Sequence, residues 1–146
     1  MIIACSLLLV VLTTLTHFEV LRGLSAVLPG LRVAARTKVV VVIFAEFAAH
    51  GVQIFLYGTA LYLLIHLANL GSLAGGSSLL SQCLYFSAET FTSLGYGDVV
   101  PTGPLRLLAG SEALNGLLLI GWSASYTYIA MERFWNGGSD AGARRR

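Results

Sequence analysis

Long apolar stretches separated by short polar connectors dominate this chain. Residues 2–20, 39–67 and 105–132 carry few charged side chains. Each is about as long as, or longer than, the roughly 20 helical residues that cross the hydrocarbon core of a bilayer. A fourth apolar stretch, residues 79–92, is too short to cross it. The pattern therefore predicts three transmembrane helices, with one shorter helix between the second and the third.

The composition indicates a lipid environment. Of the 146 residues, 56% are hydrophobic and only 11% are charged, which is more apolar than a soluble domain of this size. No basic residue precedes the first apolar stretch and no small-residue cleavage site follows it, so we expect a permanent helix rather than a signal peptide. Cys5 and Cys83 lie far apart, which predicts neither a disulfide framework nor a zinc site.

The basic residues predict the orientation of the chain. They gather between the first two apolar stretches and again after the last one: Arg22, Arg32, Arg36 and Lys38, and then Arg133, Arg144, Arg145 and Arg146. Because basic residues concentrate in cytoplasmic loops, both regions are expected on the cytoplasmic side. We therefore expect a multi-pass protein of the cell (plasma or inner) membrane, with its N-terminus outside and its C-terminus in the cytoplasm. The net charge of +2 does not indicate a nucleic-acid partner, because the basic residues lie in a connector and a tail.

This orientation implies that residues 79–92 enter the membrane and return on the same side. If they spanned it, the two basic regions would lie on opposite sides. Re-entrant backbone at membrane depth is tolerated only where protein or a water-filled cavity covers its polar groups, so a pore is expected. Ser77 or Ser78 is expected to cap the short helix, and Gly95 and Gly97 to follow its end.

The segment after this helix carries the most informative motif. Residues 87–101 read Ser-Ala-Glu-Thr-Phe-Thr-Ser-Leu-Gly-Tyr-Gly-Asp-Val-Val-Pro. In a soluble protein Gly-Tyr-Gly-Asp alone would indicate a tight turn. Here it follows a short apolar helix between two membrane helices, and it resembles the pore signature of the potassium channel family, whose usual filter reads Thr-Val-Gly-Tyr-Gly-Asp. The resemblance covers about residues 39–132.

The resemblance implies a selectivity filter at residues 93–97. In that family, backbone carbonyls replace the water around a dehydrated ion. It assigns the K+ ligands here to the carbonyls of Ser93, Leu94, Gly95 and Tyr96, with Gly97 completing the filter and the Ser93 hydroxyl adding a lower ring of oxygens. Glycine adopts positive φ at little cost, which allows successive carbonyls to face one axis. Leu94 and Tyr96 are expected to point outward, between filter and pore helix. Each chain supplies one filter, so the pore requires a homotetramer.

Residues around the filter are expected to support or gate it. The support set is Glu89, Thr90 and Asp98, in which Glu89 and Asp98 either share a proton behind the filter or face water separately. The candidate gate and cavity set is Gly116, Leu118, Gly121, Trp122 and Ser125. Gly116 is a candidate gating hinge by resemblance, and a helix-packing position by the general use of small residues in membranes.

Four ionisable residues lie within the first two predicted transmembrane helices. They are His17 and Glu19 on the first, and Glu46 and His50 one turn apart on the second. We expect a buried hydrogen-bonded pair between helices rather than a metal site or a pH sensor, because no cysteine or third histidine completes a ligand set. The first helix lacks regularly spaced arginines, so the sequence does not indicate a voltage sensor.

The sequence thus predicts an all-α membrane protein with a tetrameric pore. An outer helix, a re-entrant pore helix with its filter and an inner helix are preceded by one additional transmembrane helix. We expect residues 1–38 to form this extra helix and a basic connector, 39–134 the pore domain, and 135–146 a short, flexible, basic cytoplasmic tail. The expected function is passive K+ conduction, with no enzymatic activity and no cofactor beyond permeant ions. Because Ser93 and Leu94 replace threonine and valine, a weakly selective cation channel is one alternative, and a non-conducting membrane regulatory subunit is another.

Overall fold

The computed structural model describes the backbone of residues 1–76 and 79–143, and the side chains as far as Phe134. In chain order its elements are α1 (Ile2–Val27), η1 (Leu28–Gly30), α2 (Ala35–His66), β1 (Leu73–Ala74), α3 (Leu80–Phe91), β2 (Val100–Pro101) and α4 (Leu105–Ala143). The expected capping residues Ser77 and Ser78 lie outside the described residues. The N-cap of α3 is Leu79.

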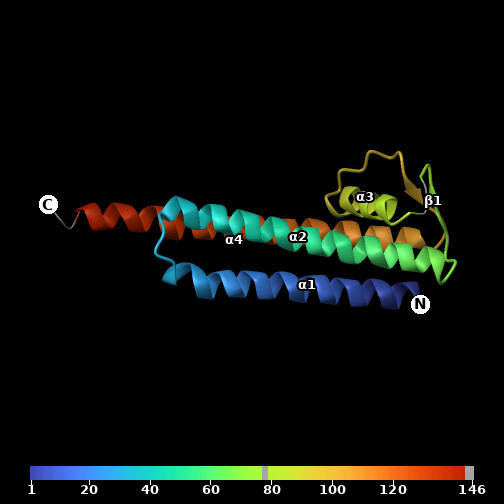
Figure 1. Cartoon of the computed structure of the whole chain (residues 1–146), viewed down its shortest axis with the longest axis horizontal. Helices are drawn as coiled ribbons and strands as arrows, with labels where there is room; N and C mark the ends of the chain where they lie inside the picture. The colour runs from blue at the N-terminus through green and yellow to red at the C-terminus, as the bar shows by residue number, and fades with distance from the viewer. Residues whose placement is uncertain (77–78, 144–146) are drawn as a thin grey trace.

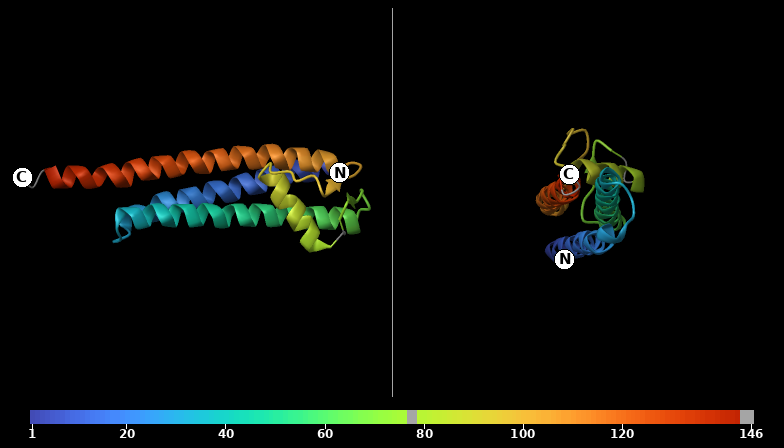
Figure 2. Two further views of the ribbon diagram at one scale, coloured as in Figure 1. Left: turned by 90° about the horizontal axis from the view of Figure 1, so that it is seen from above. Right: turned by 90° about the vertical axis from the view of Figure 1, so that its left-hand side faces the viewer.

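Three long helices lie side by side along one axis, with α3 packed at the end where the chain begins (Figures 1 and 2). Three segments of the described chain are long and apolar enough to cross a membrane: Ile2–Gly30, Ala35–His66 and Leu105–Phe134. The chain therefore forms an all-α, multi-pass membrane protein, as the hydrophobic pattern predicts. Helix α3 is too short to span, and the chain returns from it to the same end of the bundle (Figure 1).

The helices extend past several of their expected bounds. Helix α1 runs to Val27 and ends where Pro29 enters the 3-10 turn η1, because proline has no backbone N–H to continue the hydrogen-bond ladder. Helix α4 continues beyond the expected end at residue 132 to Ala143. No proline follows Pro104 to interrupt it, so the backbone of the expected tail is helical as far as Ala143.

Close backbone contact fixes α3 between α2 and α4. A Cβ added to Gly58 of α2 would lie 2.7 Å from a Leu84 methyl carbon and 3.0 Å from the Leu84 Cα. Between membrane helices the driving force is close packing and interhelical hydrogen bonding rather than expulsion of water, and small residues allow the necessary approach. The apolar core at this junction includes Tyr57, Phe86, Phe91 and Leu108, all buried.

A small antiparallel clip anchors the segment outside the bundle. Strands β1 and β2 pair Leu73 with Pro101 and Ala74 with Val100. The Thr102 backbone N–H donates to the Ser72 carbonyl at 2.9 Å beside this pair. The loop between α3 and α4 is therefore held at both ends, by α3 on one side and by the clip on the other.

Candidate functional site

Helix α3 ends in a Schellman motif that turns the chain into the glycine-rich loop. The Leu94 N–H donates to the Glu89 carbonyl at 2.9 Å, and the Ser93 N–H donates to the Thr90 carbonyl at 3.0 Å. Ser93 is the first residue past the C-cap and has φ +57°, the left-handed conformation that this motif requires and that glycine usually supplies. The turn thus fixes where the loop begins and in which direction it leaves the helix.

The loop that follows alternates in backbone handedness. The angle φ is +57° at Ser93, +56° at Gly95 and +79° at Gly97. Leu94 and Tyr96 between them keep negative φ, since Asn69 and Ser93 are the described non-glycine residues with positive φ. An extended strand points successive peptide groups alternately to opposite sides, and positive φ at every second residue departs from that pattern. The expectation of positive φ at both glycines is confirmed.

The sequence interpretation did not anticipate positive φ at Ser93. The available signal was its position directly after the short helix, where a left-handed residue commonly ends the helix. The Leu94 and Tyr96 side chains were expected to pack behind the filter, but within the single chain they are 59% and 70% exposed. Their partners are therefore not supplied by the described part of their own chain.

Tyr85 links α3 to Asp98 after the loop. Its hydroxyl donates to Asp98 Oδ2 at 3.0 Å, and its pKa is raised, first by hydrogen bonding to Glu89 and then by burial and by Asp98. Glu89 is only 4% exposed, and its Oε1 has no hydrogen-bond partner among the described residues. No hydrogen bond between Glu89 and Asp98 occurs in the described part of the chain, so proton sharing by this pair stays a prediction.

Tyr85 was missed by the sequence interpretation, although it lies one turn before Glu89 on the same helix face. A second missed contact joins α3 to α4. The Ser87 hydroxyl contacts the buried Glu112 carboxylate and lies 2.9 Å from the Ile54 carbonyl oxygen. Ser87 therefore links α3 to both neighbouring helices.

Gly116 lies where α4 meets the end of α3. A Cβ added here would be 2.0 Å from the Phe91 carbonyl oxygen, a distance at which the two helices would have to separate. This geometry favours the packing interpretation of Gly116 over the hinge. Gly110 and Gly121 on the same helix have no neighbouring atom within 4 Å of an added Cβ.

The other candidate cavity residues follow Gly116 along α4. The Leu118 side chain is exposed, and the Ser125 hydroxyl donates to the Gly121 carbonyl of its own helix at 2.9 Å. The Trp122 ring lies against α1, with its centroid 5.4 Å from that of His17. Trp122 is therefore half-covered by α1.

A buried polar network joins α1, α2 and α4. Gln53 Nε2 lies 3.2 Å from His17 Nδ1, and Gln53 Oε1 lies 2.8 Å from His50 Nδ1. Ser123 Oγ lies 2.9 Å from His50 Nε2 and 3.4 Å from His17 Nε2. Nearby, the Asn115 amide donates to the Thr13 hydroxyl at 2.7 Å. Polar side chains at membrane depth thus meet one another instead of lipid.

The expected buried hydrogen-bonded contact between helices is present, because His17 of α1 and His50 of α2 both reach Gln53. Glu46 accepts a hydrogen bond from Thr127 of α4 at 2.6 Å. Glu19 is exposed and pairs with Arg22 on its own helix at 2.7 Å. Among the described residues no group of three metal-ligating side chains occurs.

Three membrane-spanning helices, with a short helix packed against two of them and followed by a glycine-rich loop, have the architecture of a membrane ion channel (Figure 2). The sequence model described as "Ion channel" matches residues 49–133, more than half of the chain. The chain therefore belongs to this ion channel family. Helix α1 and the first turns of α2 precede the matched region.

Two curated proteins share a short segment with the chain. One is Protein LctB of Bacillus caldotenax, 50% identical over 42 residues, and the other is Protein LctB of Geobacillus stearothermophilus, 48% identical over 42 residues. In both cases the match covers 29% of this chain and 31% of the relative. The chain thus aligns with less than a third of the length of these relatives. No solved structure matches the chain.

Proposed function

We propose that this chain is one of four identical subunits of a potassium-selective channel that conducts K+ passively across the cell membrane. The observation that carries the proposal is the alternation of φ from Ser93 to Gly97 directly after the Schellman turn. Membership of the ion channel family and the Gly-Tyr-Gly-Asp string support it.

The proposed ion ligands are backbone oxygens. Carbonyls of Ser93, Leu94, Gly95 and Tyr96 from four chains replace the hydration shell of the ion, and the Ser93 hydroxyl adds oxygens at the cavity end. A single chain offers these oxygens on one side of the ion path only. Closed cyclic symmetry supplies the other three sides.

The proposed support for the filter is the Tyr85 hydrogen-bond group. The Tyr85 hydroxyl links α3 to Asp98, which follows the filter, and Glu89 lies one turn after Tyr85 on the same helix. The exposed faces of Leu94 and Tyr96 would pack against the neighbouring subunit. In this way the filter is held from behind by its own chain and from the side by the next one.

Flux measurements test the proposal. The purified protein in liposomes with an outward K+ gradient should carry K+ current that Ba2+ blocks, while an equal Na+ gradient should give far less current. Cross-linking in the same membranes should give a ladder that ends at four subunits. A ladder that ends elsewhere, or no cation current at all, would refute the proposal.

A weakly selective monovalent cation channel is the second candidate, because Ser93 and Leu94 replace the usual threonine and valine. Serine lacks the methyl group that restricts χ1 in threonine, which leaves the innermost oxygen ring less constrained. Comparable K+ and Na+ currents with Ba2+ block would favour this candidate. Absence of current together with cross-linking to a different protein would favour a regulatory subunit.

A further inference from the structure

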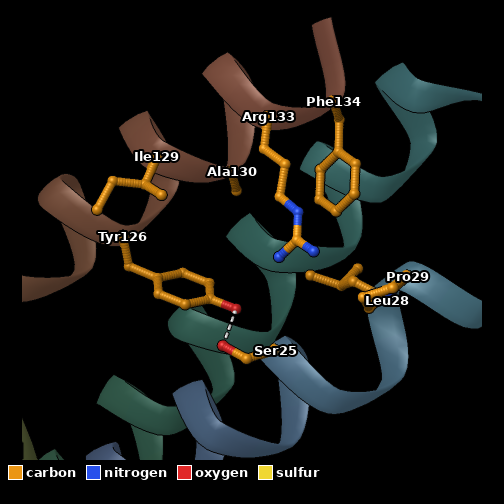
Figure 3. A pocket seen from close by; sticks show the side chains of 8 residues that line it. All are labelled: Ser25, Leu28, Pro29, Tyr126, Ile129, Ala130, Arg133 and Phe134. Atoms are coloured by element: carbon orange, nitrogen blue, oxygen red, sulfur yellow. Dashed lines mark hydrogen bonds between the residues drawn. The ribbon is translucent and has the colours of Figure 1, made fainter. Parts of the chain in front are cut away.

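A pocket lies between the end of α1 and α4, at the end of the bundle opposite the filter (Figures 1 and 3). Its volume is about 80 Å³, and its walls are almost entirely apolar. Leu28 and Pro29 line it from the α1 side, and Ile129 and Phe134 from α4. Leu28 and Ala130, which line it, also belong to a buried cluster with Val42 of α2.

One basic side chain lines this pocket, and a second lies close to one of its lining rings. Arg133 extends from α4 toward the end of α1 (Figure 3), and its guanidinium carbon lies 5.9 Å from the centroid of the Phe134 ring. Lys38 of α2 places its ammonium nitrogen 5.0 Å from the same ring centroid. No carboxylate lines the pocket, and the ion pair found among the described residues, Arg22 with Glu19, involves neither cation.

The hydroxyl groups in the pocket are already used. Ser25 donates to the Leu21 carbonyl at 2.9 Å, so the Tyr126 hydroxyl, 2.9 Å from Ser25 Oγ, donates to Ser25 (Figure 3). An anion in the pocket would therefore be held by Arg133 and Lys38. A guanidinium matches phosphate oxygens through paired N–H donors.

The pocket lies beside the end of the first apolar span, which ends at Gly30, and Arg32 and Arg36 follow Gly30 in the connector. Apolar walls with basic side chains close to them complement a lipid that has a negative headgroup above its acyl chains.

We propose that this pocket binds the phosphate group of an anionic phospholipid, with Arg133 and Lys38 as its ligands. The acyl chains would lie against the apolar wall formed by Pro29 and Ile129. Since the pocket joins α1 to the far end of α4, the bound lipid would connect the additional helix to the proposed pore-lining helix. This inference does not depend on which ion the filter selects.

Native mass spectrometry of the delipidated protein in neutral detergent tests the proposal. Added phosphatidylglycerol should bind more tightly than phosphatidylcholine, and Arg133→Gln should weaken phosphatidylglycerol binding about fivefold, the effect of one basic residue near an anionic surface. Arg133→Lys should retain most of the binding. Arg106→Gln is the charge-matched control, because Arg106 lies at the opposite end of α4 and bonds to the Pro101 carbonyl.

Each outcome decides the question. Equal binding of the two lipids, or equal loss with Arg133→Gln and Arg106→Gln, would overturn the proposal. Displacement of the lipid by millimolar inorganic phosphate would assign the site to free anions instead. The current of Arg133→Gln in neutral liposomes is measured separately. If Ba2+ still blocks a current in this variant, failure of the lipid site is distinguished from failure of the channel assignment.

Discussion

Ser93 has a backbone conformation that serine rarely adopts. Left-handed backbone brings the Cβ of an L-residue close to the following carbonyl oxygen. The two hydrogen bonds of the Schellman turn hold Ser93 in this conformation, so its hydroxyl is retained at a position where glycine would be less strained. This combination is consistent with a use for the hydroxyl itself, as in the proposed lower ring of ligands.

At Gly95 the backbone requirement can be separated from any steric effect. Its φ is +56° and no atom lies within 4 Å of an added Cβ. Gly95→Ala should therefore cost roughly 1–2 kcal/mol per chain through backbone strain alone, with loss of K+ current measured in liposomes. Gly51→Ala is the control, since Gly51 lies in α2 with equally open surroundings and without positive φ. Wild-type current in Gly95→Ala would contradict the proposed filter.

Tyr85 provides the test of the group behind the filter. Tyr85→Phe removes the hydroxyl that donates to Asp98, so the open-channel current should decay faster at neutral pH, as it should in Glu89→Gln. Because the pKa of Tyr85 is raised in the folded protein, the stabilisation from its protonated hydroxyl should be fully present below the ordinary value near 10. It should be lost as pH rises through the raised pKa. Unchanged decay in both variants would exclude this role.

At the scale of elements, Gly116 distinguishes packing from hinge. Gly116→Ala should destabilise the protein by about 1–3 kcal/mol, the cost of overpacking, because the new Cβ would meet the Phe91 carbonyl oxygen. Thermal unfolding in detergent would measure this. Gly110→Ala, on the same helix with open surroundings, should not lower stability. If Gly116→Ala were equally stable but changed opening, the hinge interpretation would hold.

The polar network should stabilise the contact of α1 with the other two helices. Gln53→Leu keeps the side-chain volume but leaves the Nδ1 atoms of His17 and His50 without their Gln53 contacts. We expect a loss of about 1–2 kcal/mol in reversible unfolding. Thr16→Val serves as control, because the exposed Thr16 hydroxyl bonds only within α1. Equal effects of the two substitutions would mean that the network contributes nothing specific.

The hydrophobic pattern was sufficient to predict the helices. It could not predict which side chains contact one another. The lengths of the apolar stretches predict three spans and one re-entrant helix, because bilayer thickness sets those lengths. The rotation of each helix about its axis depends on packing that no single stretch encodes. For that reason the contacts of His50 with Gln53 and Ser123, and those of Tyr85 and Ser87, were not foreseen.

At the scale of the whole molecule, cysteine labelling tests the orientation of the chain in the membrane. The connector at Arg32 and the clip at Ala74 lie at opposite ends of the bundle (Figure 1). With Cys5→Ala as background, a membrane-impermeant maleimide should label Ala74→Cys in intact cells and Arg32→Cys only after permeabilisation. Cys83 is buried and should stay unlabelled. The reverse labelling pattern would invert the proposed topology.

The alternating backbone from Ser93 to Gly97 has an electrostatic consequence. When neighbouring peptide dipoles all face the same way, they repel one another, and four such segments around one axis would add to that repulsion. A cation on the axis relieves it, because every oxygen then faces an opposite charge. The permeant ion would in that case also stabilise the pore. The filter segment of a channel without bound ions would then be less stable than that of a conducting channel.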